Sequence, residues 1–399
     1  MKQHGPTNAA LHRSPSSRAW AVLGAALLAT VAAYSDTQTA IAPGVVYREL
    51  LAPGPNRVFV LAVERTRGEY GFQVGWPEAR RNYTRRATTS QIADRYNHPP
   101  QQRVIAAINA SFFGPVPETI GAAATGGELH DMPDGAFDTL VITTDGRAAI
   151  LESLGHRWGW ICGPGSEPLT LHHYNTPHIA GTITAYTPIW GPVMTPPPTR
   201  DLAVVHMAGV SYPMRGRSEV VGTIEQTRLG IQTAIDDPLL VPPGGLVLVG
   251  SGSAGERLAQ AAVPGTQLRL YFDATHELMQ AAEVAVTGMG WLVHDGVPHE
   301  PNWKQYGFWN KRHPRTVFAW NDMHWFFIVI DGRSPISVGM TFPEMAELLT
   351  QTLGALEALN LDGGGSSTLV VDGQVRNVPS DGRERPVANA LLLTCRSGP

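Results

Sequence analysis

The amino-acid sequence predicts an α+β fold: a single mixed α/β domain with twisted mixed or antiparallel sheets and a few helices. Three observations support this prediction. Glycine and proline, with 42 and 32 residues among 399, exceed the ~12% of average usage, so turns are numerous. Short apolar segments, several of them joined by Asp-Gly pairs, are typical of strands and hairpins. Helical periodicity is confined to a few segments.

The composition excludes several classes of protein. Apolar residues make up 43% of the chain, which is too many for a disordered protein, and no Gly-X-Y period indicates collagen. The formal net charge of −4 argues against a basic nucleic-acid-binding protein, so no nucleic-acid partner is expected. Only three of the 30 basic residues are lysines, so guanidinium groups, which suit bidentate contacts with anions, carry most of the positive charge.

Residues 1–40 are predicted to be a signal peptide and a short lead-in, and the domain is expected to span 41–396. Basic residues precede an apolar run of 16 residues, Ala19 to Tyr34, and small residues offer cleavage sites ending at Ala33 or Ala40. An uncleaved N-terminal anchor is the alternative. Either interpretation predicts an exported protein, periplasmic or extracellular, and no later run reaches the roughly 18 apolar residues of a membrane span.

Export also bears on the two cysteines. Cys162 and Cys395 are an even pair, which an oxidising compartment allows to form one long-range disulfide. Two free thiols are the alternative, and the sequence leaves both open.

The first part of the domain is predicted to consist of strands and one helix. Arg57–Val63 and Tyr70–Val74 have the composition of strands, and Arg103–Ile108 is apolar enough to be a buried strand. Thr88 is expected to cap a short amphipathic helix that runs through Tyr96. Asp-Gly pairs predict hairpin turns at 145–146, 295–296 and 372–373, and a proline-rich loop is expected over 192–198.

The strongest helical pattern spans Phe342–Leu359. Thr341 and Glu344 can form a capping box at its start, and five apolar residues fall on one face. A shorter helix is expected over Gly255–Ala262. The sequence 250–255 before it matches G-x-G-x-x-G, but the helix is too short for a dinucleotide-binding unit, so we interpret this segment as a strand-to-helix turn and expect no cofactor.

Chemically useful residues concentrate between 311 and 390, above all in one glycine-rich run. Asp362 is followed by Gly363, Gly364, Gly365, Ser366 and Ser367. Three consecutive glycines cost backbone entropy, so we expect something, best explained as a ligand, to approach the bare backbone there. The N–H groups of such a loop can form an anion-binding nest with Asp362 at its mouth. A tight turn in which Asp362 bonds its own loop is the alternative.

Charged residues at neighbouring strand ends are further candidates. Arg315, Arg333 and Arg385 are candidates for a phosphate clamp, with solvated surface arginines as the alternative. Asp331 is the second candidate carboxylate, although Asp-Gly is also ordinary turn chemistry. His313, before a proline, is a candidate proton donor or phosphate contact, or else a structural histidine.

Two candidates lie earlier in the chain. Asn109 is suited to bind a sugar hydroxyl or the backbone of the glycine loop, and Phe112 is suited to stack on a sugar, although phenylalanine is more often a core residue. No metal site is expected, because His172, His173 and His178 lack the spacing of metal ligands.

Several ordered segments resemble the phosphodiester glycosidase family, which includes N-acetylglucosamine-1-phosphodiester alpha-N-acetylglucosaminidase. They are NASFFG at 109–114, RHPRT at 312–316, IDGR at 330–333, NLDGGGSST at 360–368 and PSDGRERPVANALLL at 379–393. The resemblance extends from about residue 44 to 393 and implies a single catalytic domain that acts as a hydrolase. It does not identify the substrate, although the lysine-poor composition and the signal peptide suggest a bacterial protein in exopolysaccharide or cell-envelope metabolism.

The reaction that the resemblance implies is hydrolysis of the C1–O bond of a sugar-1-phosphate diester, which releases a sugar and a phosphomonoester. In this hypothesis the three arginines and the amides of 363–367 hold the phosphate. Asp362 acts as nucleophile or activates water, with Asp331 as second choice.

Two other functions stay open at this point. One is a glycosidase or lyase that acts on a polysaccharide without phosphate, since arginines also bind uronate carboxylates. The other is a non-catalytic envelope glycan-binding protein that stacks sugars on Trp291, Trp303, Trp309 and Trp320.

Overall fold

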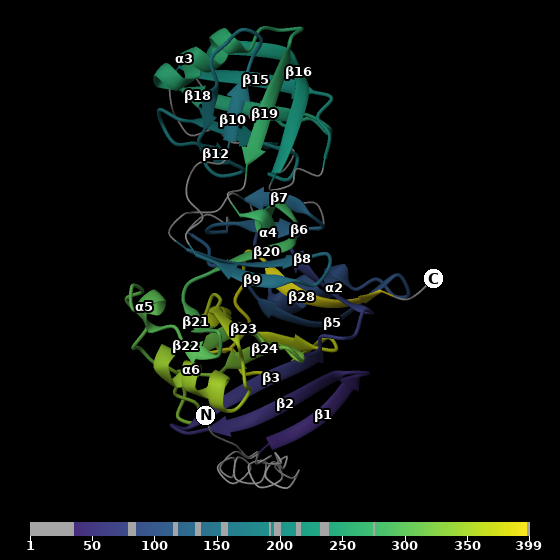
Figure 1. The fold of residues 1–399 in the computed structure, drawn as a ribbon, viewed down its shortest axis with the longest axis vertical. Helices are drawn as coiled ribbons and strands as arrows, with labels where there is room; N and C mark the ends of the chain where they lie inside the picture. Colours follow the sequence, from purple (N-terminus) through teal and green to yellow (C-terminus); the bar gives the residue numbers. More distant parts are fainter. Residues whose placement is uncertain are drawn as a thin grey trace, which may run out of the picture.

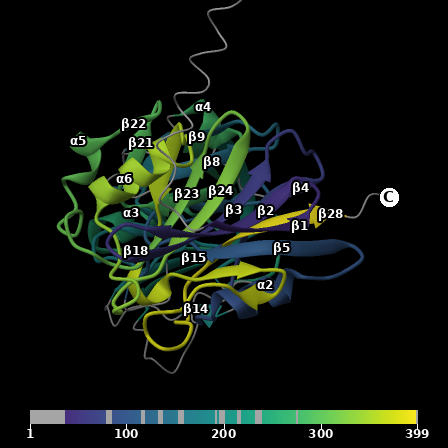
Figure 2. The same cartoon turned by 90° about the horizontal axis from the view of Figure 1, so that it is seen from below.

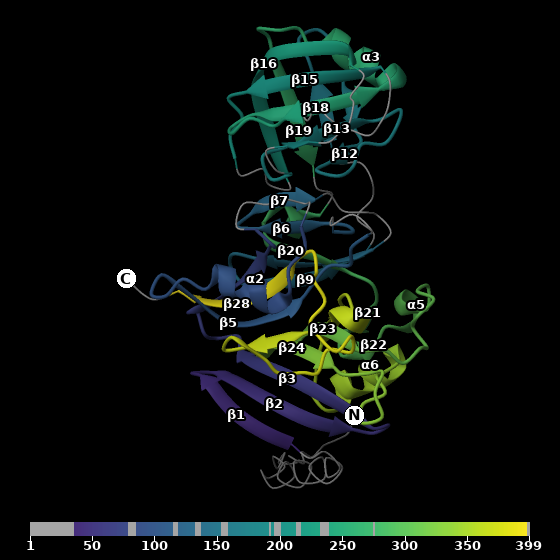
Figure 3. The ribbon, with the colours of Figure 1, turned by 180° about the vertical axis from the view of Figure 1, so that it is seen from behind.

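The computed structural model describes residues 36–78, 85–114, 119–131, 137–152, 159–190, 193–194, 201–212, 217–231, 239–273 and 276–396. The chain has a mostly β, α+β fold with several antiparallel sheets, as predicted (Figure 1). Four large sheets follow one another along the longest axis, and the views from front and back agree on their order (Figures 1 and 3). We call them the basal, middle, upper and lobe sheets.

The basal sheet has eight strands, all paired antiparallel. Its central strands consist almost entirely of buried residues, because apolar side chains cover both of its faces. In spatial order the strands are β1 (Asp36–Ala42), β2 (Val45–Ala52), β3 (Asn56–Glu64), β24 (His324–Ile330), β23 (Arg315–Trp320), β25 (Glu357–Asn360), β21 (Trp291–His294) and β22 (Val297–Pro298).

The middle and upper sheets lie between the basal sheet and the lobe. The middle sheet contains β27 (Gln374–Val375), β26 (Leu369–Val371), β5 (Gln102–Asn109), β28 (Ala390–Arg396) and β4 (Tyr70–Gly75). The upper sheet contains β7 (Glu128–Asp131), β6 (Ala123–Thr125), β20 (Ala282–Gly288), β8 (Asp138–Thr143) and β9 (Ala148–Leu151).

The lobe sheet forms the far end of the molecule (Figure 1). It contains β11 (Leu169–Leu171), β10 (Gly159–Cys162), β19 (Gln267–Asp273), β16 (Arg217–Ile231), β15 (Leu202–Ala208), β18 (Leu246–Ser251), β13 (Ile183–Tyr186) and β12 (His173–Tyr174). Its β12–β13 pair is parallel. A separate two-stranded sheet joins β14 (Val193–Met194) to β17 (Leu239–Leu240).

The helices cover outer faces of these sheets. Helices α5 (Glu300–Trp303) and α6 (Phe342–Gln351) pack on the basal sheet, and α2 (Thr89–Tyr96) packs on the middle sheet from the opposite side (Figure 2). Helix α3 (Gly252–Ala261) packs on the lobe sheet, and α4 (Glu277–Gln280) precedes β20. Among the described residues, no helix is long and apolar enough to cross a membrane.

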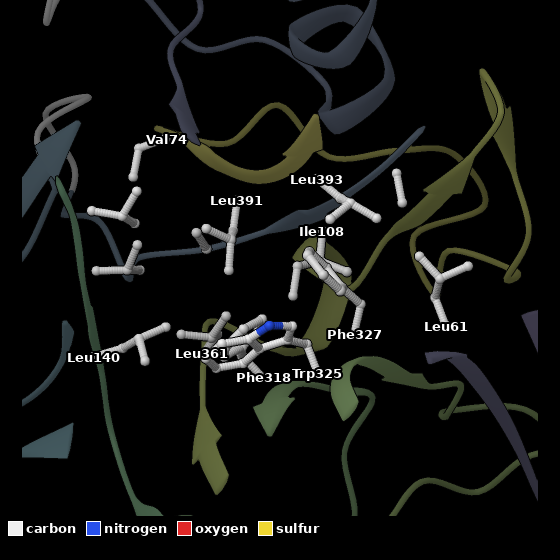
Figure 4. Close-up of a cluster of buried hydrophobic side chains, with 14 of the residues drawn as sticks. Leu61, Val74, Ile108, Leu140, Phe318, Trp325, Phe327, Leu361, Leu391 and Leu393 are labelled. Atoms are coloured by element: carbon white, nitrogen blue, oxygen red, sulfur yellow. The ribbon is translucent and has the colours of Figure 1, made fainter. Parts of the chain in front are cut away.

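One apolar core joins the basal, middle and upper sheets (Figure 4). Phe318, Trp325 and Phe327 of the basal sheet meet leucines of β28 and Leu140 of the upper sheet. The Phe327 ring lies 5.3 Å from that of Phe318 in an edge-on arrangement and 6.0 Å from that of Phe72. The close packing of these rings fixes how the three sheets sit on one another.

The predicted local elements are mostly confirmed. The three strands expected in the first part are β3, β4 and β5, and α2 begins after Thr88 with the Thr88–Gln91 capping box. All three Asp-Gly pairs join paired strands, and the pairs at 295–296 and 372–373 have positive φ at both residues. The predicted loop 192–198 lies outside the described residues except for β14, and so do residues 1–35.

The long helix predicted over Phe342–Leu359 is wrong in its second half. Helix α6 ends at Gln351, and Gly354 has a left-handed φ of 60°, which stops a helix. The chain then returns as β25, which pairs with β23 and β21 and buries Ala358 and Leu359 between them. Pairing within the sheet therefore outweighs the helical periodicity of the leucines.

The glycine-rich segment 250–255 connects β18 to α3, as the strand-to-helix interpretation expects. A Cβ at Gly250 would lie 2.8 Å from the Gly255 Cα atom, so these glycines let helix and strand pack closely. Cys162 lies in β10 of the lobe sheet and Cys395 in β28 of the middle sheet, and the two do not form a disulfide with each other.

The boundaries predicted for the domain, 41–396, stay a prediction. Strand β1 begins at Asp36, so signal cleavage after Ala33 would leave it whole, whereas cleavage after Ala40 would remove most of it.

We expect Phe327→Ala to lower the free energy of unfolding by about 3–5 kcal/mol, because it leaves a cavity among the packed rings. Chemical denaturation followed by circular dichroism measures the change. Met323→Ala, a matched control at a side chain that is 62% exposed, should change stability by less than about 0.5 kcal/mol. Equal effects of the two substitutions would contradict the role of this core.

Candidate functional site

The predicted site residues meet where strands of the basal and middle sheets end. Arg315 begins β23, Asp331 follows β24, and Asp362 lies two residues beyond β25. Because β23 is antiparallel to both β24 and β25, its first residues lie beside their last ones, as the pairing of Arg315 with Ile330 illustrates.

Asn109, the last residue of β5, holds the glycine loop in place. Its Nδ2 donates to the carbonyl of Asp362 at 2.6 Å, and its Oδ1 accepts from the Thr316 hydroxyl at 2.8 Å and the Thr368 N–H at 3.1 Å. The side chain is fully buried. The sequence suggested that Asn109 binds either a sugar hydroxyl or the backbone of the glycine loop. In the structure it binds the loop backbone.

Each of the three glycines lies against one of the three arginines. A Cβ at Gly363 would lie 2.9 Å from the Pro314 carbonyl and 3.9 Å from Cδ of Arg315. At Gly364, where φ is 64°, a Cβ would lie 2.9 Å from Nη2 of Arg333. At Gly365 it would overlap Nη2 of Arg385 and Oδ2 of Asp381. The guanidinium groups of Arg333 and Arg385 thus approach the bare backbone at Gly364 and Gly365, whereas Gly363 lies against the Pro314 carbonyl and the aliphatic stem of Arg315.

Arg315 is a buried cation without a carboxylate partner among the described residues. Its Nε donates to the Met340 carbonyl at 3.0 Å, and its Nη2 donates to the carbonyls of Phe308 and Lys311 at 3.0 and 2.6 Å. Nη1 makes no hydrogen bond with any part of the chain that the structure describes. Burial lowers the pKa of Arg315 to about 9, which leaves it charged at neutral pH.

His313 lies next to this cation. Burial first, and then the charges of Arg315, Arg333 and Lys311, lower the pKa of His313, so its imidazole is neutral at neutral pH. Its Nδ1 is buried and has no hydrogen-bond partner among the described residues. Because a buried lone pair without a partner costs less than a buried N–H without one, the proton is expected on Nε2, where it can be donated.

Arg333 and Arg385 share a carboxylate that the sequence analysis missed. Asp381 Oδ2 accepts from Nε and Nη2 of Arg385 at 2.9 and 2.7 Å, and its Oδ1 lies 3.8 Å from Nη1 of Arg333. The Ser380 hydroxyl lies 3.4 Å from the same Nη1. The four-residue spacing of Asp381 and Arg385 was the available signal. Arg333 has a φ of 63°, an uncommon backbone conformation for this residue type and one that clusters at functional sites.

The environment of Asp362 raises the proton affinity of its carboxylate. Burial raises the pKa of Asp362 to about 6, while the Ser366 hydroxyl, the Gly363 N–H and the charge of Arg385 act in the opposite direction. The group is therefore ionised at neutral pH but takes up a proton in mildly acidic solution. A carboxylate of this kind can serve as a general base.

Asp331 has a different environment. Its Oδ1 accepts from Asn377 Nδ2 and the Val378 N–H, both at 3.1 Å, and Oδ2 lies 3.2 Å from the same N–H. Burial raises the pKa of Asp331, and these two hydrogen bonds oppose the rise. The carboxylate thus fastens the chain after β27, and Asn377 is another residue that the sequence analysis missed.

Several backbone N–H groups of the glycine loop already donate hydrogen bonds within the protein. The Gly364 N–H donates to the Pro314 carbonyl at 2.9 Å, and the N–H groups of Ser366 and Ser367 bond back to Gly363 and Gly364 at 3.3 Å. These three amides are engaged, so the predicted nest is less open than expected. The side chains of Ser366 and Ser367 are buried.

Phe112 lies at the border of the site. Its half-buried ring is 6.3 Å from the ring of Phe308, and the Phe308 ring lies 5.6 Å from the guanidinium carbon of Arg315. Phe308 is a further residue that the sequence analysis missed, because its position comes from tertiary packing.

The histidines considered for a metal lie elsewhere. His178 is buried in the lobe between the hydroxyls of Thr184 and Ser251, at 3.0 and 2.9 Å. Among the described residues, one group has metal-ligand types close together: His294, Asp295 and Glu357, far along the basal sheet from Asp362. There Glu357 already bonds His294 Nδ1 at 2.9 Å and Trp291 Nε1 at 2.7 Å.

Known proteins are similar to parts of this chain. The family model described as phosphodiester glycosidase matches residues 221–394. The "SPbeta prophage-derived uncharacterized protein YomE" of Bacillus subtilis strain 168 is 37% identical over 105 residues, which are 26% of this chain and only 16% of that protein.

Two solved structures have the same overall fold. A hypothetical protein from Synechocystis is 20% identical with a TM-score of 0.73, over 90% of this chain and 64% of that one. A protein of Burkholderia pseudomallei K96243, described as a "putative exported protein", is 22% identical with a TM-score of 0.66, over 87% of this chain and 76% of that one. Only the fold follows from identities this low.

The family match covers the three arginines, the three glycines and the two candidate carboxylates, and it leaves Asn109 and Phe112 outside. Residues 221–394, which carry most of the candidate site, are therefore similar in sequence to the phosphodiester glycosidase family.

Proposed function

We propose that this chain is an exported hydrolase that cleaves the C1–O bond of a sugar-1-phosphate diester and releases a sugar and a phosphomonoester. The observation that carries the proposal is the charge arrangement at the glycine loop. The guanidinium groups of Arg333 and Arg385 lie against Gly364 and Gly365, and the stem of Arg315 lies against Gly363. The Arg315 side chain is buried and has no carboxylate partner among the described residues. A phosphodiester anion supplies the missing counter-charge.

The phosphate is held by Nη1 of Arg315, by Arg333 and by the Nε2–H of His313. Arginine suits this task because its planar donors match the oxygens of a phosphate. The lowered pKa of His313 favours a hydrogen bond to the phosphate over proton donation, since a neutral imidazole is a weak acid.

Asp362 acts on the sugar carbon as nucleophile or through a water molecule. In its ionised form it carries the negative charge that an oxocarbenium-like transition state requires. Its raised pKa places the change of charge near the operating pH, where a general base is most effective.

The leaving group needs little help from an acid. A phosphomonoester anion is a good leaving group, so the C1–O bond can break without a strong proton donor, provided that its charge is stabilised. The arginines stabilise that charge, which accounts for their number at the loop.

Asp381, Asp331 and Asn109 act as positioning residues. Asp381 orients the guanidinium groups of Arg385 and Arg333, and Asp331 fastens the segment that leads to them through Asn377. Asn109 holds the backbone of Asp362. The rings of Phe112 and Phe308, 6.3 Å apart, offer apolar faces to the sugar ring.

Export is proposed on two grounds. The sequence of residues 1–40 has the features of a signal peptide, and a structural neighbour is described as a "putative exported protein". An exported enzyme meets sugar phosphodiesters in exopolysaccharides and cell-envelope polymers.

The first test is a substrate panel. The purified chain should release free sugar and a phosphomonoester from N-acetylglucosamine 1-phosphate methyl ester or a related hexose 1-phosphate diester, as measured by anion-exchange chromatography. Uncharged aryl glycosides should not react. Turnover of aryl glycosides alone would refute the phosphate assignment, and binding without turnover of either class would favour a glycan-binding protein.

Asp362→Asn should lower kcat by about 10²- to 10⁴-fold, because the amide cannot act as a base. For the unmodified enzyme, kcat/KM should rise with pH through about 6, as Asp362 loses its proton and becomes the active carboxylate. Stopped assays across a pH series measure both. Asp372→Asn, at an exposed carboxylate that pairs with Arg103, is the control and should retain activity. An active Asp362→Asn enzyme would contradict the assigned role.

Gly365→Ala should leave the fold intact but displace Arg385 and Asp381, whose flexible ends occupy the space of the new methyl group. If one charged hydrogen bond to the phosphate depends on them, KM should rise about tenfold to a hundredfold, since such bonds contribute about 1.5–3 kcal/mol. Gly68→Ala is the matched control, because nothing lies within 4 Å of its Cβ position. Unchanged kinetics for Gly365→Ala with an unchanged melting temperature would exclude this part of the clamp.

A further inference from the structure

A large cleft lies where the basal, middle and upper sheets meet, at the end of the sheets away from Asp362. Its volume is about 890 Å³, within the roughly 300–1,000 Å³ of small-molecule sites. Strands β3 and β24 of the basal sheet, β4, β5 and β28 of the middle sheet, and β6, β8 and β20 of the upper sheet all contribute to it. We call it the distal cleft.

The lining of the distal cleft is layered. Its floor is apolar and buried, with Val63, Trp325, Ile142 and Val284. Half-buried polar side chains form the walls, and exposed charged residues form the rim. Sugar rings have the same two-sided character, with apolar C–H faces and polar hydroxyl edges.

Two glutamines on the wall offer a donor and an acceptor side by side. Gln102 Nε2 donates to Gln73 Oε1 at 3.1 Å and to the Tyr96 carbonyl at 3.0 Å. This leaves Gln73 Nε2 and Gln102 Oε1 without a partner among the described residues. A donor next to an acceptor matches two neighbouring hydroxyl groups of a sugar.

The charged residues that line the cleft are four carboxylates, Glu64, Glu69, Asp145 and Glu283, and two arginines, Arg65 and Arg67, so carboxylates are in excess. On the rim, Arg67 pairs with Glu64 at 3.1 Å and with Glu69 at 3.5 Å. On the walls stand one cation and one carboxylate: Arg65, whose guanidinium lies 4.1 Å from the centre of the Trp325 ring, and Glu283, for which the described residues provide no ion pair. The excess of carboxylates repels an anionic ligand, and the amide groups of the two glutamines that have no partner among the described residues suit a polar ligand without charge.

Two strands run from the distal cleft to the candidate active site. Strand β24 leads from Trp325 to Asp331, and β5 leads from Gln102 to Asn109. At about 3.3 Å per residue, the six steps along β24 span about 20 Å. A polymeric substrate of several sugar units is long enough to reach both ends.

We propose that the distal cleft binds a short, uncharged oligosaccharide segment and so retains a polymeric substrate while its phosphodiester is cleaved at Asp362. The choice of sugars as the ligand class rests on the proposed function, whereas the site itself rests on the cleft geometry. A peptide strand added to the edge of β4 fits less well, because the Val74 N–H on that edge is already bonded to the Thr125 hydroxyl at 3.0 Å.

The test measures binding of chitotetraose, maltotetraose and cellotetraose by isothermal titration calorimetry, with Asp362→Asn present in all samples to prevent turnover. At least one tetrasaccharide should bind. Adding Gln73→Ala together with Glu283→Gln should weaken that binding at least about tenfold, or about 1.4 kcal/mol. Adding instead Glu347→Gln, at an exposed position on α6 outside the cleft, should leave it unchanged.

Activity separates this inference from the proposed function. With Asp362 restored, Gln73→Ala plus Glu283→Gln should leave kcat and KM for a single-sugar phosphodiester unchanged, at an unchanged melting temperature. Failure of all three tetrasaccharides to bind, or equal affinity in the double variant, would overturn the distal cleft. A third outcome is also distinguishable: the chain cleaves no phosphodiester, yet it binds a tetrasaccharide and the double variant does not. That outcome would overturn the proposed function and support the distal cleft.

Discussion

The close approach of three arginine side chains to the backbone of three glycines, two of them through their guanidinium groups, is the constraint on which the rest of the site depends. Any side chain at 363–365 would occupy space that now holds Arg315, Arg333, Arg385 or their supports. Two hydrogen bonds fix this backbone without help from side chains of the glycines: Asn109 donates to the Asp362 carbonyl, and the Gly364 N–H donates to the Pro314 carbonyl. The loop and the arginines therefore form one unit that strands of two sheets assemble.

The electrostatic environment follows from that assembly. Arg315 is surrounded by backbone carbonyls and two aromatic rings, which accept its hydrogen bonds and face its charge without neutralising it. A lysine, with a compact charge and no fork of donors, would not satisfy three carbonyls in this geometry. The same burial that isolates the cation raises the pKa of Asp362, so one desolvated region contains both a buried guanidinium group and a carboxylate of raised proton affinity.

Much of this could be predicted from the sequence, and the reasons for the failures are physical. Strands, hairpins and the helix at Thr88 follow from local chemistry, and the glycine run pointed to the loop. The sequence suggested a ligand against those glycines, whereas arginines of the protein take that place in the structure. Asp381, Phe308 and Asn377 were missed because their roles come from contacts between distant segments. The end of α6 was missed because β25 gains its partners only in the folded sheet.

The lobe sheet has a consequence for how this protein can be divided. Its strands lie in one stretch of the chain, between β9 and β20 of the upper sheet, so connectivity alone would allow the lobe to be cut out. Its apolar core, however, continues into Leu129, Val141 and Ala285 on the outer face of the upper sheet. A shortened chain would keep every strand of the basal, middle and upper sheets and yet expose a contiguous apolar face to water. The lobe is thus a topological insertion that the body needs for solubility.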